Sequence, residues 1–307
     1  MHDLLKRLRD NIASVLFGNS DGVSRVICCL LSRGHVLIED VPGVGKTLLA
    51  TALARSIDCS FSRIQLTPDL LPSDILGVSM YNKSSGEFSF KRGPLFANIV
   101  LADEINRTPP RTQSALLEAM SEATVSADGV VMTLEPPFMV VATQNPFEFE
   151  GTYPLPENQL DRFLMRIDLG YPDPQAEARV LELRPSSRLL QSLAPVLRRE
   201  DVIDLQKRVD EIKIDRSLID YIVMLANATR RNPRLVHGLS PRGALALSQA
   251  CRSWALMAGR DFVIPDDVHD LWLSVCSHRV VARQAGATRE ETDIILRESL
   301  ESIPSPA

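Results

Sequence analysis

Hydrophobic residues follow two different spacings along this chain of 307 residues, and the spacing changes near residue 170. Before that point, short apolar runs typical of buried strands alternate with stretches in which apolar residues recur every three or four positions, as in helices. The apolar runs cover 36–38, 62–66, 98–103, 138–144 and 164–169, and the helical stretches cover 3–17, about 21–33, 48–54 and 111–120. Strands separated in this way by helices predict a three-layer α/β fold with a five-stranded parallel sheet.

Two further segments are predicted to be β-hairpins that interrupt this alternation. The first covers 78–92, with a turn at 83–86 and with Phe88 and Phe90 on one face. The second covers 125–134 and carries Asp128-Gly129, a residue pair typical of tight hairpin turns. The first half of the chain should therefore combine a parallel sheet with two antiparallel hairpins.

After Tyr171-Pro-Asp-Pro174 the strand-like runs disappear and helical periodicity dominates. Helices are predicted at 201–211, 215–231, 241–258 and 265–282. Ser240 and Pro241 suit the cap and the first position of the third of these helices, and Gly259 follows its end. This change of pattern predicts a domain boundary near residue 170.

The length of the chain and its 45% hydrophobic content are sufficient for two packed domains. We expect an α/β domain at residues 1–170 and an all-helical domain at residues 171–307. Thirty-four Lys and Arg residues against 39 Asp and Glu residues give 34 − 39 = −5, so nucleic acid is not the default partner.

The longest apolar run, Val26–Leu31, has six residues, and the N-terminus alternates charged residues with Leu. Neither a membrane segment nor a signal sequence is therefore expected, and the protein should be soluble and cytoplasmic. The five cysteines form neither a C-x-x-C pair nor an even set, so we expect reduced, mostly buried cysteines rather than disulfides or zinc ligands.

The segment from His35 to Thr47 combines a buried strand, a glycine-containing loop and the start of a helix. Gly43 and Gly45 allow successive N–H groups to point at one anion, Lys46 adds a positive charge, and the Thr47 hydroxyl can ligate Mg²⁺. The expected phosphate-binding residues are Val41, Pro42, Gly43, Val44, Gly45, Lys46, Thr47 and Leu48. Asp40 stands where the P-loop pattern has its first glycine, and an ordinary strand-to-helix turn is the alternative interpretation.

Asp103 and Glu104 follow another predicted buried strand. Beside a bound nucleotide, Asp103 would hold Mg²⁺ through water and Glu104 would polarise the attacking water. The alternative is an acidic pair that caps the next helix. Asn145 ends a third strand with an amide suited to the same water or to a phosphate, although Asn-Pro is also a common turn sequence.

Two arginines differ in what the helix dipole predicts for them. Arg242 lies in the first turn of a predicted helix, where a cation is disfavoured, and a facing phosphate would explain its position. Arg162 lies near the end of a short helix that starts at Pro156, where a cation is favoured. A solvated capping charge therefore explains Arg162 at least as well as a functional role.

Together these residues resemble the AAA+ ATPases and, within them, the MoxR family. The matching segments are 34–47, 71–77, 93–96, 101–107, 113–120, 142–146, 159–163 and 240–242. Asp40 is compatible with the resemblance, because MoxR proteins commonly carry an acidic residue or glycine there. The resemblance implies a central sheet of strand order 5-1-4-3-2, a helix-2 insert at 78–92, a hairpin before sensor 1 at 125–134, and a helical lid after residue 170.

The resemblance also implies roles for the individual residues. Lys46 and Thr47 would belong to Walker A, Asp103 and Glu104 to Walker B, Asn145 to sensor 1 and Arg242 to sensor 2, and Arg162 would be the arginine finger that reaches a neighbouring subunit's nucleotide. The segment from Val15 to Gly18 matches the adenine side of the site, although Ser20 stands where the family often has Glu or Gln.

The implied function is Mg²⁺-dependent ATP hydrolysis by a ring, with six subunits as the expected number. The ring would remodel or mature a client protein complex together with a partner that carries a von Willebrand factor A (VWA) domain. Nucleotide would lie between core and lid, with Arg242 of the lid and Arg162 of the next subunit near its γ-phosphate.

Two other functions are compatible with the sequence. A nucleic-acid motor is supported by Lys83, Lys91 and Arg92 on or beside the first hairpin, and opposed by the acidic net charge and by Asp128 in the second turn. An ATPase rate stimulated by DNA and strongly reduced by salt would favour the motor. A nucleotide-switched scaffold would bind ATP without turning it over, which the Asp103-Glu104 pair disfavours.

Overall fold

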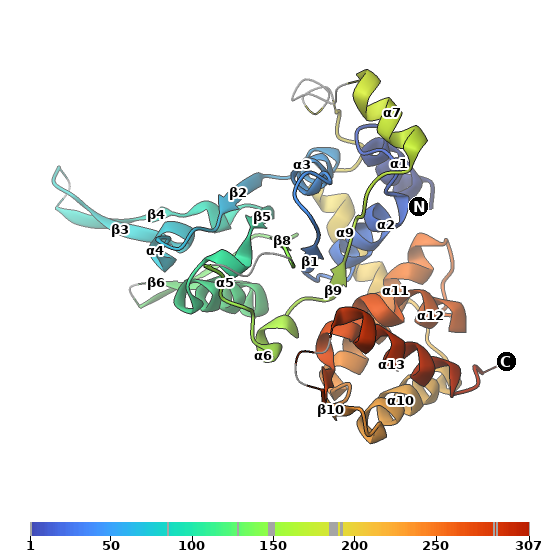
Figure 1. Cartoon of the computed structure of the whole chain (residues 1–307). Helices are drawn as coiled ribbons and strands as arrows, with labels where there is room; N and C mark the ends of the chain where they lie inside the picture. Colours follow the sequence, from blue (N-terminus) through green and yellow to red (C-terminus); the bar gives the residue numbers. More distant parts are fainter. Residues whose placement is uncertain are drawn as a thin grey trace.

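A five-stranded parallel sheet forms the centre of the first half of the protein (Figure 1). The computed structural model describes residues 2–84, 86–127, 129–146, 151–183, 190, 193–284, 286 and 288–306. The strands are β1 (Val36–Glu39), β2 (Phe61–Gln65), β5 (Ile99–Asp103), β8 (Met139–Gln144) and β9 (Met165–Ile167), and they lie in the order β2-β5-β8-β1-β9. Numbered among themselves along the chain, these strands have the predicted order 5-1-4-3-2, so the predicted fold class is confirmed.

Helices cover both faces of this sheet. Alternate residues of a strand point to opposite faces, so Val36 and Ile38 of β1 pack in one core cluster with α1 (His2–Ala13), α2 (Ser20–Leu31) and α3 (Lys46–Ser56). Leu37 packs in a second cluster with Leu116 and Leu117 of α5 (Pro110–Glu122). A short helix, α4 (Pro72–Leu76), packs beside α5. The central strands β1, β5 and β8 are buried on both faces, whereas only Ile64 of the edge strand β2 is buried.

Both predicted hairpins are present. The first pairs β3 (Gly77–Asn82) with β4 (Glu87–Arg92), and the second pairs β6 (Thr124–Ala127) with β7 (Val130–Thr133). In Figure 1 they extend to the left, away from the C-terminal helices. Ser85 of the first turn and Asp128 of the second lie outside the described residues.

The C-terminal part is mainly helical. It contains α7 (Pro174–Leu183), α9 (Arg199–Glu211), α10 (Arg216–Arg231), α11 (Pro241–Met257), α12 (Pro265–Cys276) and α13 (Arg289–Glu301). The sequence did not predict α7 or α13. The expectation that strands end before this part was also wrong, because β10 (Leu235–His237) pairs with β11 (Val281–Ala282).

The predicted helix at 265–282 is too long by six residues. It ends at Cys276 and is followed by the short 3-10 helix η3 (Ser277–Arg279) and by β11. Two tertiary contacts explain the early end: His278 and Arg279 both donate hydrogen bonds to the main chain before β9, and β11 pairs with β10. The first helix likewise ends at Ala13, before the predicted residue 17.

The C-terminal helices pack against the N-terminal helices and the edge strand β9. Gln206 of α9 donates a hydrogen bond of 2.7 Å to the Leu30 carbonyl, and the hydroxyls of Ser32 and Ser253 lie 2.7 Å apart, with all four residues buried. Among the described residues, no helix is long and apolar enough to cross a membrane. The division of the chain near residue 170 stays a prediction.

Candidate functional site

The loop between β1 and α3 has the backbone geometry of an anion cradle. Gly43 and Gly45 have φ angles of 92° and 96°, which side chains other than glycine rarely adopt. Gly45 is also the N-cap of the 11-residue helix α3, whose first N–H groups lack partners within the helix. A Cβ atom at Gly45 would come within 2.9 Å of the Leu16 side chain, whereas the space beside Gly43 is open. A phosphate group fits this arrangement of donors.

Lys46 opens α3 and lies near three carboxylates. Its Nζ donates a hydrogen bond of 2.7 Å to the Asp40 carbonyl. Burial lowers the pKa of Lys46, and the charges of Asp40, Asp103 and Glu104 oppose that shift. The predicted Walker A lysine and Walker B acids therefore do lie in one site.

Asp40, the departure from the P-loop pattern, has a structural role. One carboxylate oxygen accepts a hydrogen bond of 2.8 Å from the Val41 amide. The other accepts bonds of 2.8 Å and 2.7 Å from the amides of Leu169 and Gly170, just after β9. A glycine at position 40 could not make these bonds, which connect the loop after β1 to the end of the neighbouring strand.

Asp103 ends β5 and is buried, with both carboxylate oxygens occupied. Thr143 of β8 donates a hydrogen bond of 2.6 Å to one oxygen, and Arg63 of β2 donates one of 2.7 Å to the other. A metal ion would therefore be held by Asp103 through water.

Glu104 has the strained φ and ψ angles of 59° and 53°. Its amide donates to the Thr143 hydroxyl at 3.0 Å, which fixes this conformation. Its carboxylate accepts from Gln65 Nε2 at 2.9 Å and lies 3.2 Å from Arg107 Nε, in the short 3-10 helix η2 (Ile105–Arg107). The carboxylate is thus held at the end of β5 by side chains from two other elements.

Asn145 follows β8, which lies in the sheet between β1 and β5. Because the carboxyl ends of parallel strands meet at one edge, the half-buried Asn145 lies between the loop after β1 and the acids after β5. Gly18, with φ at 82°, lies close to the segment that enters α7, because a Cβ atom there would touch Pro172 before this helix and Ala176 within it.

The residues present suit a nucleotide with Mg²⁺. No cluster of three or more His, Cys, Asp or Glu side chains that could hold a metal occurs in the described part of the chain. Magnesium usually keeps several waters and binds to one or two protein oxygens together with phosphates. Thr47 in the first turn of α3 would supply such an oxygen, and Asp103 at the end of β5 would hold the ion through one of its waters.

Arg162 lies after α6 (Glu157–Leu160), and its guanidinium donates hydrogen bonds of 2.7 Å to the Leu117 carbonyl and to the Ser121 hydroxyl. Both acceptors belong to the last turns of α5. Arg162 therefore lies at the amino edge of the sheet, since Leu164 donates to the His35 carbonyl just before β1.

Arg242 does not lie near the cradle of its own chain. Its Nε is 3.6 Å from a carboxylate oxygen of Asp161, and Asp161 precedes β9, whereas the cradle follows β1. Four residues of β1 separate these two edges by about 13 Å. In this structure Arg242 is therefore paired at the edge of the sheet opposite its own cradle, and its expected contact with a γ-phosphate stays a prediction. Its unfavourable place in the first turn of α11 is offset by Asp161.

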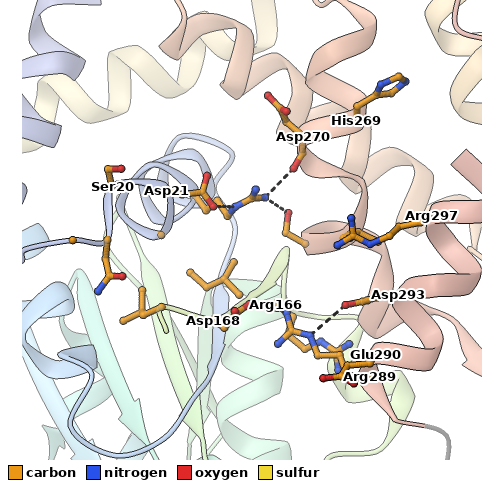
Figure 2. Close-up of a pocket in the computed structure, with 18 residues that line it drawn as sticks. Ser20, Asp21, Arg166, Asp168, His269, Asp270, Arg289, Glu290, Asp293 and Arg297 are labelled. Atoms are coloured by element: carbon orange, nitrogen blue, oxygen red, sulfur yellow. Dashed lines mark hydrogen bonds and ion pairs between the residues drawn. The ribbon is translucent and has the colours of Figure 1, made fainter. Parts of the chain in front are cut away.

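A polar cavity of about 790 Å³ lies between the start of α2, the end of β9 and the helices α12 and α13 (Figure 2). Gly18 lines it, but the cradle residues 41–48 and the acids after β5 do not. Three of the arginines that line it are paired with carboxylates: Arg25 with Asp21 at 2.7 Å, Arg166 with Glu39 at 3.5 Å, and Arg289 with Asp168 at 2.9 Å. This cavity is an ion-paired junction rather than the phosphate site.

The sequence interpretation missed Arg63, Gln65 and Thr143, which position the two acids. Arg63 and Gln65 are two residues apart on a strand and therefore share a face, which was visible in the sequence. Their proximity to the acids depends on β2 being the neighbour of β5, which the spacing of residues does not reveal.

The fold and this site define a P-loop nucleotide-binding protein of the AAA+ class. The profile described as "ATPase family associated with various cellular activities (AAA)" matches residues 35–165, and the profile of the AAA lid domain matches residues 227–299. The chain belongs to the MoxR family of AAA+ ATPases.

Similar proteins cover nearly the whole chain. The uncharacterized protein YeaC of Bacillus subtilis is 48% identical over 100% of this chain and 96% of its own. Chaperone MoxR1 of Mycobacterium tuberculosis is 41% identical over 98% of this chain and 82% of its own. A crystal structure from Cytophaga hutchinsonii, of a candidate ATPase, is 35% identical with a TM-score of 0.91 and covers 100% of this chain and 96% of that one.

Proposed function

We propose that this protein hydrolyses ATP with Mg²⁺ in the cytoplasm. The observation that carries the proposal is the meeting of Lys46, Asp103 and Glu104 at one edge of the sheet, beside a glycine cradle at the start of α3. Family membership supports nucleotide binding, and the pair of acids held by Thr143 supports turnover.

Each residue has a distinct part in the proposed reaction. The amides of the cradle and Lys46 bind the outer phosphates. Mg²⁺, when bound near Thr47 and Asp103, would neutralise charge on the β- and γ-phosphates. Glu104 orients a water molecule for attack on the γ-phosphate, and Asn145 adds a hydrogen bond on the side of β8. The strained backbone of Glu104 supports this role, since strain of this kind clusters at active sites.

We also propose that the protein acts as a ring, with six subunits expected, in which each active site is shared. Arg162 and Arg242 both lie at the edge of the sheet opposite their own cradle. A head-to-tail contact would bring this edge of one subunit to the cradle of the next. Both arginines would then contact the neighbour's γ-phosphate.

The work done by the ring is proposed to be remodelling of a client protein complex with a VWA-domain partner. The name of the Mycobacterium tuberculosis relative, a chaperone, supports a protein client. The first hairpin also supports it, because Met80, Tyr81 and Phe88 expose apolar side chains at its surface.

Steady-state release of phosphate from ATP tests the proposal directly. We expect turnover that requires Mg²⁺ and stops with EDTA. Binding of ATP without turnover, in the presence of Mg²⁺ and at concentrations where the protein is oligomeric, would indicate a nucleotide-switched scaffold. Stimulation by DNA that falls steeply with salt would indicate a nucleic-acid motor.

A further inference from the structure

Arg279 of η3 is a buried arginine that binds the turn between α6 and β9. Its side chain is 3% exposed. Nε donates a hydrogen bond of 2.8 Å to the Asp161 carboxylate, and the two terminal nitrogens donate to the carbonyls of Phe163 at 2.6 Å and Leu164 at 3.0 Å. The same guanidinium also donates to the Val275 carbonyl in the last turn of α12.

These bonds cannot be replaced by water. Burial lowers the pKa of the Arg279 guanidinium, and the charge of Asp161 opposes that shift. Removing one partner of a buried pair leaves an uncompensated charge, which is far more costly than losing an exposed pair. The planar guanidinium satisfies several acceptors in a fixed geometry, which a lysine ammonium on a flexible chain cannot do.

The turn held in this way carries Arg162. Asp161 precedes Arg162 and Phe163 follows it, so the backbone is fixed on both sides of the arginine. His278, also in η3, donates a second hydrogen bond of 2.9 Å to the Phe163 carbonyl. The Arg162 side chain meanwhile rests on the last turns of α5 in the α/β part of the protein.

We propose that Arg279 is a positioning residue for the arginine finger Arg162. This inference rests on the proposed function, because it requires Arg162 to act on a neighbour's nucleotide. The bonds of Arg279 fix the backbone on both sides of Arg162 and thereby set where its side chain can reach.

The carboxylate of Asp161 contacts both Arg279 and Arg242. The carboxylate contacts Arg279 through one oxygen and Arg242 through the other, at 2.8 Å and 3.6 Å. The Arg242 side chain is 60% exposed, so its contact with Asp161 is the weaker of the two. Arg242 can leave Asp161 for a phosphate without disturbing the buried bonds of Arg279.

A double-mutant cycle on kcat tests the inference with Arg279→Lys and Arg162→Ala. Arg279→Lys keeps the positive charge beside Asp161 but cannot donate the hydrogen bonds that the guanidinium makes to the carbonyls of Phe163 and Leu164. We expect it to lower kcat by about 10- to 100-fold, because small misplacement of a catalytic group has effects of this size. ATP affinity should change by less than about twofold, since the cradle is untouched. In the Arg162→Ala background, Arg279→Lys should have no further effect.

Independent, multiplying effects of the two substitutions would overturn the inference, as would a kcat of Arg279→Lys equal to that of the wild type. Asp161→Asn provides a second variant if Arg279→Lys folds poorly. It removes the charge facing Arg279 and should show the same lack of additivity with Arg162→Ala. Absence of ATPase activity in the wild-type protein would instead refute the proposed function.

Arg260→Lys is the matched control. Arg260 pairs with buried Asp267 at 2.5 Å within the C-terminal helical part and makes no contact with the turn in the described structure. Its substitution should leave kcat unchanged in both backgrounds after correction for the folded fraction. A loss of kcat as large as that of Arg279→Lys would mean that general weakening of the helical part, rather than positioning of Arg162, explains the defect.

Discussion

Thr143 donates a hydrogen bond of 2.6 Å to Asp103 and accepts one of 3.0 Å from the Glu104 amide. Thr143→Val keeps the shape and removes both bonds. We expect unfolding free energy to fall by about 1–3 kcal/mol, because buried polar groups lose their partner, and kcat for ATP to fall as Glu104 loses its anchor. Denaturant unfolding and phosphate release measure the two effects. Exposed Thr133 offers a control, since Thr133→Val should change neither quantity appreciably.

Lys46→Ala and Glu104→Gln should separate binding from hydrolysis. Lys46 meets the phosphates in the ground state, so Lys46→Ala should weaken ATP binding. Glu104→Gln should retain ATP and lose turnover by about 10²-fold or more, since it removes a group that acts on the attacking water. Calorimetric titration measures the dissociation constant for ATP, and phosphate release measures kcat. Equal ATP affinity in the two variants would contradict the assignment of the cradle.

Mixing two strongly impaired variants, each with a low but measurable ATPase rate, should restore activity if the active site is shared. Arg162→Ala lacks the finger and Glu104→Gln lacks the water-positioning group. In a random equal mixture, roughly a quarter of the contacts would join an intact Glu104 to an intact Arg162 of the neighbour. The ATPase rate should therefore be highest near equal amounts. Full activity of the Arg162→Ala protein without any partner variant would mean that Arg162 only caps the end of α5.

Arg242→Ala should behave like Arg162→Ala in such mixtures, because both arginines lie at the same edge of the sheet.

Asp40→Gly should destabilise the protein even though it completes the P-loop pattern. The substitution removes the acceptor of three main-chain N–H groups, at Val41, Leu169 and Gly170. Hydrogen bonds to a charged group are each worth about 1.5–3 kcal/mol, so we expect a loss of at least about 2 kcal/mol in unfolding free energy. Asp40→Asn retains an acceptor oxygen and should lose less. An unchanged denaturation midpoint for Asp40→Gly would contradict this role.

Stability should fall as the pH decreases from about 6.5 to about 4, in part because of His35. Burial lowers the pKa of His35 from 6.5 to about 4. Its Nδ1 accepts from the Val140 amide and its Nε2 donates to the Met120 carbonyl, so only the neutral ring fits. In this pH range the unfolded chain binds a proton that the folded chain does not. This difference lowers the free energy of unfolding by about 3 kcal/mol.

Equilibrium unfolding of His35→Gln between pH 4 and 7 checks this effect. The variant should show a smaller slope of unfolding free energy against pH, whatever its absolute stability. His237 is exposed, and His237→Gln should leave the slope unchanged. Burial also lowers the pKa of His278, so this residue contributes in the same direction. Part of the slope should therefore remain in the His35→Gln variant. An identical slope in His35→Gln and the wild type would contradict the argument.

The sequence by itself determined the sheet, the two hairpins and the cradle. Apolar runs such as Ile99–Asp103 are long enough and apolar enough to be buried strands in almost any context, and φ angles above 90° at Gly43 and Gly45 follow from the local chain. The start of α11 after Ser240 was likewise correct, because the Ser240 hydroxyl accepts from the Gly243 amide within one turn. Each of these features depends on neighbours in sequence.

Only the tertiary structure decided which residues share a site. Arg242 was expected at the nucleotide of its own chain, yet it pairs with Asp161 at the other edge of the sheet. The helix starting at Pro265 ends at Cys276 because Arg279 forms hydrogen bonds to the turn at Asp161, more than 100 residues away in sequence. A periodic pattern defines the faces of an element, but its place and its end depend on partners distant in the chain. That dependence is the reason why the cradle could be predicted and the position of Arg242 could not.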